Sequence, residues 1–149
     1  AIELVRPTTL PMLNCFLRLL GTMISHHGSC EVYAAPFAVN LDADDKNWVE
    51  PDISVICDPN KLTDRGCTGA PDLIFEIVSP ASRKMDYSLK NTIYSEAGVR
   101  EYWIVDPAKE RVTVYHYEED VAPVIYSFSQ EISVGIYLGL TIRIDDLID

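Results

Sequence analysis

The chain has 149 residues, of which 48% are apolar and 23% are charged, and its formal net charge is −11. This length suits one domain over residues 1–149, and the apolar content excludes a disordered chain. The excess of acidic residues argues against strong, sequence-independent affinity for nucleic acid, because that affinity comes from lysine and arginine displacing phosphate counterions.

A short strand and a helix are predicted for the N-terminal region. Residues 2–5 have a strand pattern, and apolar residues recur at three and four positions over residues 10–26, which is typical of an amphipathic helix. Asn14, Arg18 and Gly21 interrupt the apolar stretch, so it is too short to cross a membrane. With no secretion signal recognisable, we expect a cytoplasmic protein that does not enter the membrane.

Residues 31–41 alternate as one strand, or as two strands broken at Pro36, and a polar turn follows. Residues 53–57 and 73–78 are then near-continuous apolar runs, which is the pattern of central strands that are covered on both faces. Between these runs lies a loop over residues 58–70. Because loops of that length are uncommon inside compact domains, its length suggests a functional segment.

A helix is expected over residues 83–97, with Gly98 in the position that ends it. Residues 101–106 and 111–117 are predicted to form a hairpin. The tail alternates again over residues 124–128 and 132–144, which indicates at least one further edge strand before a closing turn. This order of elements predicts an α/β fold of the mixed α+β kind, a mixed β-sheet flanked by helices.

The four cysteines have none of the spacings of a zinc site. No two of them form a CxxC pair, and no paired histidines stand at zinc-ligand offsets. In a reducing compartment we therefore expect structural thiols rather than a metal site. The cysteines are Cys15, Cys30, Cys57 and Cys67.

Two carboxylates and a lysine are the candidates for chemistry. Glu76 stands inside an apolar strand, where burial of its charge would cost several kcal/mol without a cation or a proton beside it. Asp52 begins the preceding apolar run, and Lys90 lies about two turns into the helix that follows Glu76. Carboxylates of this kind bind Mg²⁺, and a lysine would orient or deprotonate an attacking water, so the set predicts metal-dependent phosphodiester hydrolysis.

The chain resembles the Uma-type family of restriction endonucleases, which belongs to the PD-(D/E)XK nuclease superfamily. The similarity is dense over residues 49–117 and weaker outside them. The segments that carry it are Pro51-Asp52, then Pro71-Asp72-Leu-Ile-Phe-Glu76-Ile-Val-Ser79-Pro80-Ala-Ser82, then Asp86, Lys90 and Tyr94, and then Ala97-Gly98-Val99-Arg-Glu101-Tyr102-Trp103-Ile-Val-Asp106-Pro107.

The resemblance implies a restriction-endonuclease-like fold, DNA as the substrate and one site for Mg²⁺ or Mn²⁺. Asp52, Glu76 and the carbonyl of Ile77 would be its metal ligands. In the superfamily a lysine stands two residues after the glutamate, where this chain has Val78. Lys90 on the following helix would take its place. A homodimer is also expected.

Two other functions remain open on the sequence. The acidic charge and Val78 both favour a catalytically inactive nuclease fold that serves as a binding or regulatory protein. An oligomeric structural protein is the other, in which Glu76 forms an internal salt bridge with Arg83 or Lys90 and leaves no room for a cation. Asp72, Asp86 and Tyr94 could orient Lys90 or a water, or could serve structure alone.

Overall fold

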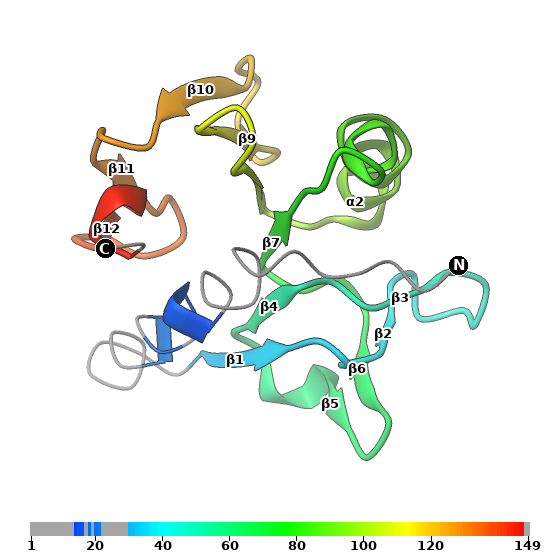
Figure 1. Cartoon of the computed structure of the whole chain (residues 1–149). Coiled ribbons are helices and arrows are strands. Elements are labelled where there is room, and N and C mark those ends of the chain that lie inside the picture. Colours follow the sequence, from blue (N-terminus) through cyan, green and yellow to red (C-terminus); the bar gives the residue numbers. More distant parts are fainter. Residues whose placement is uncertain (1–13, 17, 19, 22–29, 148–149) are drawn as a thin grey trace.

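One mixed sheet runs through the middle of the protein (Figure 1). The computed structural model describes residues 14–16, 18, 20–21 and 30–147. Within these residues the sheet has six strands, and its β7 and β8 are parallel while the other neighbours are antiparallel. The mixed sheet predicted from the sequence is therefore confirmed. In sheet order the strands are β1 (Glu31–Ala34), β4 (Ile53–Ile56), β7 (Leu73–Ile77), β8 (Glu101–Asp106), β9 (Arg111–His116) and β10 (Val124–Ser127).

The central strands lie where the apolar runs predicted them. Every residue of β4, β7 and β8 is buried, because both faces of these strands are covered. Tyr102 and Trp103 point to opposite faces of β8 and are both core residues. The hairpin from β8 to β9 is also as expected.

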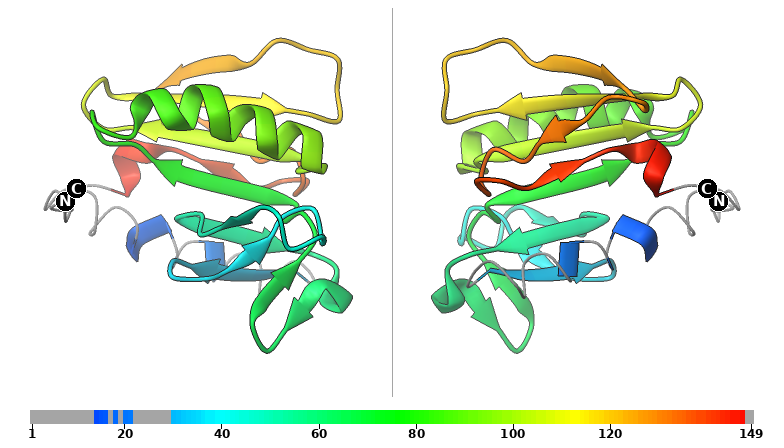
Figure 2. Two further views of the ribbon diagram at one scale, coloured as in Figure 1. Left: turned by 90° about the vertical axis from the view of Figure 1, so that its right-hand side faces the viewer. Right: turned by 90° about the vertical axis from the view of Figure 1, so that its left-hand side faces the viewer.

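A helix joins the parallel strands β7 and β8. Residues 83–97 are helical, and within them Met85–Lys90 form the π-helix η2 and Asn91–Ala97 form α2. Gly98 has a φ of 98° and ends the helix, since glycine enters this left-handed conformation without the cost of a Cβ. Figure 2 shows the helix lying across one face of the sheet. A parallel pair requires a crossover of this kind.

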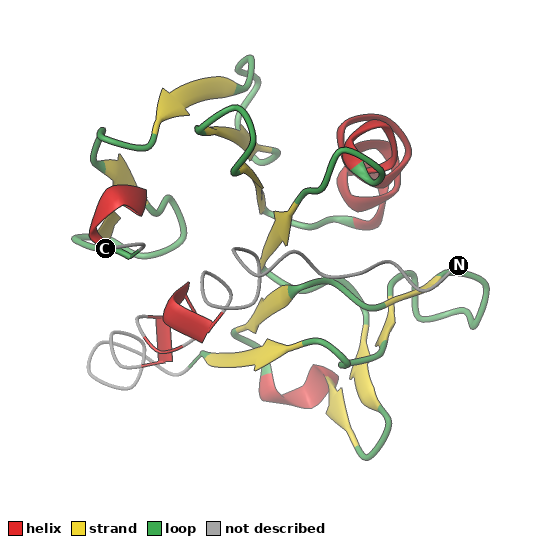
Figure 3. Cartoon of the chain, in the orientation of Figure 1, coloured by secondary structure: helices red, strands yellow, loops and turns green. Residues whose placement is uncertain are grey.

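A second sheet replaces the irregular loop expected over residues 58–70, so that prediction was wrong. Gly66 permits the close packing, because a Cβ added to it would lie 2.0 Å from the Ala38 carbonyl oxygen. Residues 31–41 likewise split into β1 and a strand of this second sheet. Its strands are β2 (Val39–Asn40), β3 (Trp48–Val49), β5 (Leu62–Thr63) and β6 (Gly66–Thr68), in the order β3-β2-β6-β5. The 3-10 helix η1 (Pro59–Lys61) directly precedes β5. Figure 3 shows these short strands in yellow, in the orientation of Figure 1.

The main sheet separates two cores. One core includes Tyr94 of α2, Val39 of β2 and Tyr102 of β8, and so joins the helix and the second sheet to one face. The other core includes Phe16 and Leu20, which belong to helical residues between 14 and 21. The rest of the helix expected over residues 10–26, and the strand expected over residues 2–5, lie outside the described residues.

The C-terminal segment covers the core that contains Phe16 and Leu20. Ile132, Ile142 and Ile144 are buried there, and the segment contains β11 (Ile132–Ser133), β12 (Thr141–Ile142) and the 3-10 helix η3 (Ile144–Asp146). The buried carboxylate of Glu101 accepts hydrogen bonds from the Trp103 indole at 2.8 Å and from the Gly135 N–H at 2.8 Å, which fastens the segment to β8. No helix in the described part of the chain is long and apolar enough to cross a membrane.

Cys30 and Cys57 form a disulfide, with their Cα atoms 4.0 Å apart. The register pairs Glu31 with Ile56. Cys30, just before Glu31, therefore lies opposite Cys57, just after Ile56. The expectation of structural thiols was therefore wrong for these two cysteines, since their pairing depends on strand register, which spacing along the chain does not reveal. Cys15 and Cys67 are free.

Candidate active site

The register of β4 and β7 places Asp52 opposite Glu76. Ile53 pairs with Phe75 in the antiparallel ladder, and Asp52 and Glu76 are the next residues along it. Residues opposite one another in such a ladder point to the same face of the sheet. The Asp52 Oδ2 atom accepts a hydrogen bond of 2.7 Å from the Ile77 N–H, which holds the aspartate at the end of β7.

Lys90 reaches from the helix to the same place. Its Nζ atom lies 2.9 Å from Glu76 Oε2 and 2.8 Å from Asp86 Oδ1. Asp86 and Lys90 are four residues apart in η2 and so lie on one side of the helix. The Tyr94 hydroxyl donates a hydrogen bond of 3.3 Å to Glu76 Oε1. The buried glutamate therefore has a partner on each carboxylate oxygen.

Burial and charge oppose ionisation of the two carboxylates. The Glu76 side chain is 5% exposed. Its burial, with the charge of Asp52 beside it, raises the pKa of Glu76 from 4.5 to about 8, although Lys90 acts in the opposite direction. Burial also raises the pKa of Asp52, against the hydrogen bond from Ile77 and the charge of Lys90. One lysine does not balance the acidic groups gathered here.

Lys90 itself stays charged at neutral pH. Burial lowers the pKa of its ammonium group, but the carboxylates of Glu76 and Asp86 outweigh burial and raise this pKa above its ordinary value. A lysine in this state donates hydrogen bonds and supplies positive charge, and it does not accept a proton. This favours a role in orienting the attacking water over that of general base, both of which the sequence leaves open for Lys90.

The raised pKa of Glu76 predicts a pH dependence of stability. A carboxylic acid with a higher pKa in the folded state stabilises the fold below its unfolded pKa, and this contribution is lost as pH rises through about 8. Without added metal, the free energy of unfolding of the wild type should fall between about pH 5 and pH 9 by a few kcal/mol relative to Glu76→Gln. Urea unfolding at both pH values measures the difference.

Glu96→Gln is the matched control for this experiment, because Glu96 is an exposed glutamate on α2. Its stability should follow that of the wild type across the pH range. Equal pH slopes for wild type and Glu76→Gln would show that Glu76 is not a strained buried acid.

The donor chemistry of the site suits a divalent cation. Asp52 and Glu76 offer carboxylate oxygens, which Mg²⁺ prefers, and the charge of Asp52 is one of the causes that keep Glu76 from ionising. A bound cation would remove that repulsion. Within the described residues, no three His, Cys, Asp or Glu side chains gather in a group that could hold a metal ion. Any metal ion would therefore need water, backbone or substrate oxygens as further ligands, as Mg²⁺ commonly has.

Other expected members of the site lie elsewhere. Asp72 directly precedes β7, at the end of the strand opposite Glu76, and its carboxylate binds the Cys57 N–H and Arg100 instead of orienting Lys90. Arg83 forms a two-point ion pair with Asp106, at 2.9 and 3.1 Å, and so is not the partner of Glu76.

Arg65, Arg83, Lys84 and Lys90 are basic residues that could form a phosphate-binding cluster near the site, but the fold divides them. Arg65 belongs to the turn between β5 and β6, which lies on the far side of the molecule from α2 (Figure 1). Arg83 and Lys90 are engaged by acidic partners. Of that cluster, Lys84 remains an exposed cation close to the site in sequence.

The chain matches known proteins over nearly its whole length. Residues 5–145 match the model of the Uma2 family, which is described as "Putative restriction endonuclease". An uncharacterized protein of Synechocystis sp. is 24% identical over 131 residues, which span 85% of this chain and 68% of that protein. A crystal structure from Anabaena variabilis, described as "a putative nuclease belonging to DUF820", is similar with a TM-score of 0.79 at 16% identity, over 98% of this chain and 83% of that one. The likeness confirms the nuclease fold, and the family match shows that the chain belongs to the Uma2 family of restriction-endonuclease-like proteins.

Proposed function

We propose that the protein is an endonuclease that hydrolyses DNA phosphodiester bonds and depends on Mg²⁺ or Mn²⁺. The observation that carries this proposal is the meeting of Asp52, Glu76 and Lys90 at one end of β4 and β7. Family membership supports the same reaction class. Asp52, Glu76 and the Ile77 carbonyl would hold the cation, which would polarise the phosphoryl oxygen when bound.

The side chains of the site divide the remaining work. Lys90, which carries a positive charge, would hydrogen-bond to a phosphate oxygen or the attacking water and offset negative charge in the transition state. Asp86 accepts from the Lys90 ammonium and so keeps it beside Glu76 when a cation engages that carboxylate. Tyr94 orients the carboxylate of Glu76 through its hydroxyl. Pre-organisation of this kind lowers the cost of assembling the site during the reaction.

Weak and salt-sensitive activity is the expected result for this chain. Its net charge of −11 repels DNA, and two cations near the site are already paired with acidic groups. With Mn²⁺ or Mg²⁺ at low ionic strength, the wild type should nick plasmid or single-stranded DNA slowly. A gel assay across a salt series measures this.

An inert wild type would overturn the proposal. If no DNA or RNA substrate is cut with either metal, while DNA is still bound, the protein is a binding or regulatory member of the fold. If neither binding nor cleavage occurs and Glu76 keeps its contact with Lys90 at every metal concentration, the carboxylates serve as internal ion pairs.

The remaining expectations from the sequence are proposals of the same kind. They are a single nuclease domain, a cytoplasmic location and a homodimer. The exposed apolar side chains of Val124 and Ile125 on β10, at one edge of the described sheet, support a contact between two copies.

A further inference from the structure

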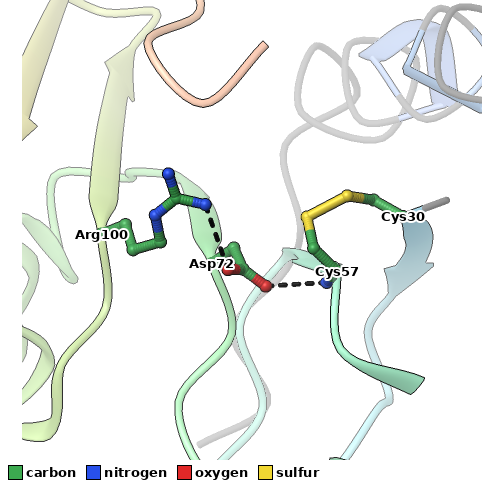
Figure 4. The surroundings of a disulfide bond; sticks show 4 residues. All are labelled: Cys30, Cys57, Asp72 and Arg100. Atoms are coloured by element: carbon green, nitrogen blue, oxygen red, sulfur yellow. Dashed lines mark hydrogen bonds and ion pairs between the residues drawn. A yellow bond between two sulfur atoms is a disulfide. The ribbon is translucent and has the colours of Figure 1, made fainter. Parts of the chain in front are cut away.

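The disulfide lies at the opposite end of the strands that carry the candidate site. Cys30 precedes β1 and Cys57 follows β4, whereas Asp52 precedes β4 at its other end. Figure 4 shows the surroundings of this bond, with Asp72 between Cys57 and Arg100. The proposed hydrolysis uses neither cysteine, so the bond needs a separate account.

β1 depends on this bond more than the inner strands do. It is the edge strand of the described sheet, pairs with β4 over four residues, and has none of its side chains fully buried. A strand that buries little apolar surface gains little from the hydrophobic effect. The covalent link to β4 therefore adds to the backbone ladder in holding β1 in place.

The other end of β1 contacts the site. The Ala35 N–H donates a hydrogen bond of 3.0 Å to the Asp52 carbonyl oxygen. β1 thus runs from the disulfide to the backbone of a proposed metal ligand. Loosening of β1 would release this contact.

The disulfide end also fixes the strand that carries Glu76. The Cys57 N–H donates a hydrogen bond of 2.7 Å to Asp72 Oδ2, and Asp72 directly precedes β7. Arg100 Nη1 lies 3.4 Å from the other carboxylate oxygen of Asp72. β1, β4 and β7 are therefore connected at this end through one covalent bond and one carboxylate.

We propose that Cys30 and Cys57 form a redox-sensitive latch that holds Asp52 in register with Glu76. A dithiol reductant would open it: the S–S bond takes up two electrons and two protons to give two thiols, and the reductant becomes a disulfide. Both cysteines are partly exposed, so a reductant can reach them, whereas the free Cys67 is buried. The consequence for cleavage rests on the proposed function, but the latch itself does not.

Thiol labelling tests whether the latch forms. After treatment with a mild oxidant, denatured wild-type protein should react with maleimide at Cys15 and Cys67, and after dithiol treatment at all four cysteines. Mass spectrometry of the labelled peptides identifies the sites. Four reactive thiols after oxidation would overturn the proposal.

Stability and hydrogen exchange test what the latch does. Dithiol should lower the Tm of the wild type by about 5–10 °C, as expected for loss of a cross-link closing a loop of this length. Exchange at the Ala35 amide should speed up more than exchange in β8. Cys30→Ser/Cys57→Ser should show the lower Tm with no response to dithiol, and Cys15→Ser should respond as the wild type does.

An unchanged Tm and unchanged exchange at Ala35 after complete reduction would also overturn the latch. If the double variant fails to fold, the wild type with and without dithiol still decides. Slower DNA nicking after reduction would connect the latch to the active site. Absence of nicking in both states would count against the proposed function alone, because labelling, Tm and exchange do not depend on cleavage.

Discussion

Replacing Glu76 by alanine is expected to lower DNA nicking by a factor on the order of 10² or more, and Asp52→Ala should do the same. Each substitution removes one of the two carboxylates that meet at the end of β4 and β7. A cation that has lost either ligand would bind weakly and polarise the phosphate poorly. Initial nicking rates at saturating Mn²⁺ measure the loss, and calorimetry of Mg²⁺ and Mn²⁺ binding should show weaker affinity in both variants.

The folded state of these variants separates chemistry from stability. Glu76→Ala removes an acid that resists ionisation in its buried position, so the variant should remain folded at pH 7. Circular dichroism checks this before any rate is compared. Glu96→Ala, at an exposed position of α2, is the matched control and should keep wild-type activity. Cleavage that survives in Glu76→Ala would remove this residue from the mechanism.

Lys90→Ala is expected to abolish detectable nicking while metal affinity stays nearly the same or rises slightly. The substitution removes the positive charge that lies 2.9 Å from Glu76, so transition-state charge is no longer offset. The same loss removes a charge that repels a bound cation. Calorimetry with Mn²⁺ and a nicking assay on the same preparation separate the two effects.

The pH at which Mn²⁺ binding is measured affects the result for Lys90→Ala. Lys90 lowers the pKa of Glu76, so its removal lets protons compete more strongly with the metal at this carboxylate. Binding should therefore be compared near pH 9, where Glu76 is ionised in the wild type. Lys109→Ala, which removes an exposed lysine from the turn after β8, is the matched control. Undiminished turnover in Lys90→Ala would exclude this lysine from the chemistry.

The contact between Lys90 and Glu76 fits an internal ion pair as well as an active site, so the cost of the arrangement has to be compared with its benefit. A buried pair of this kind is weak evidence for a stabilising role, because desolvation of both charges offsets their attraction. The charge of Asp52 beside Glu76 adds to the free-energy cost of ionising Glu76, so the arrangement does not favour stability. Carboxylates whose ionisation is opposed in this way are common at functional sites, which supports the proposed active site.

Local sequence determined the central strands, the helix and its end. Near-continuous apolar runs predicted β4 and β7, because strands covered on both faces need apolar side chains in both directions. Gly98 marked the end of α2, since glycine adopts the left-handed conformation there. Glu76 was notable from the sequence because a carboxylate inside an apolar strand must find a partner.

Only the tertiary structure decided which of these residues meet. Register along β4 and β7 brings Asp52 opposite Glu76, and the helix brings Lys90 and Asp86 over the same strand end. The same cause explains the two errors, the disulfide between Cys30 and Cys57 and the second sheet over residues expected to form a loop. Strand pairing joins residues far apart in the chain. A shift of one residue in the register would turn every side chain of a strand to the other face, and the pattern within one segment does not determine which partner or register is used.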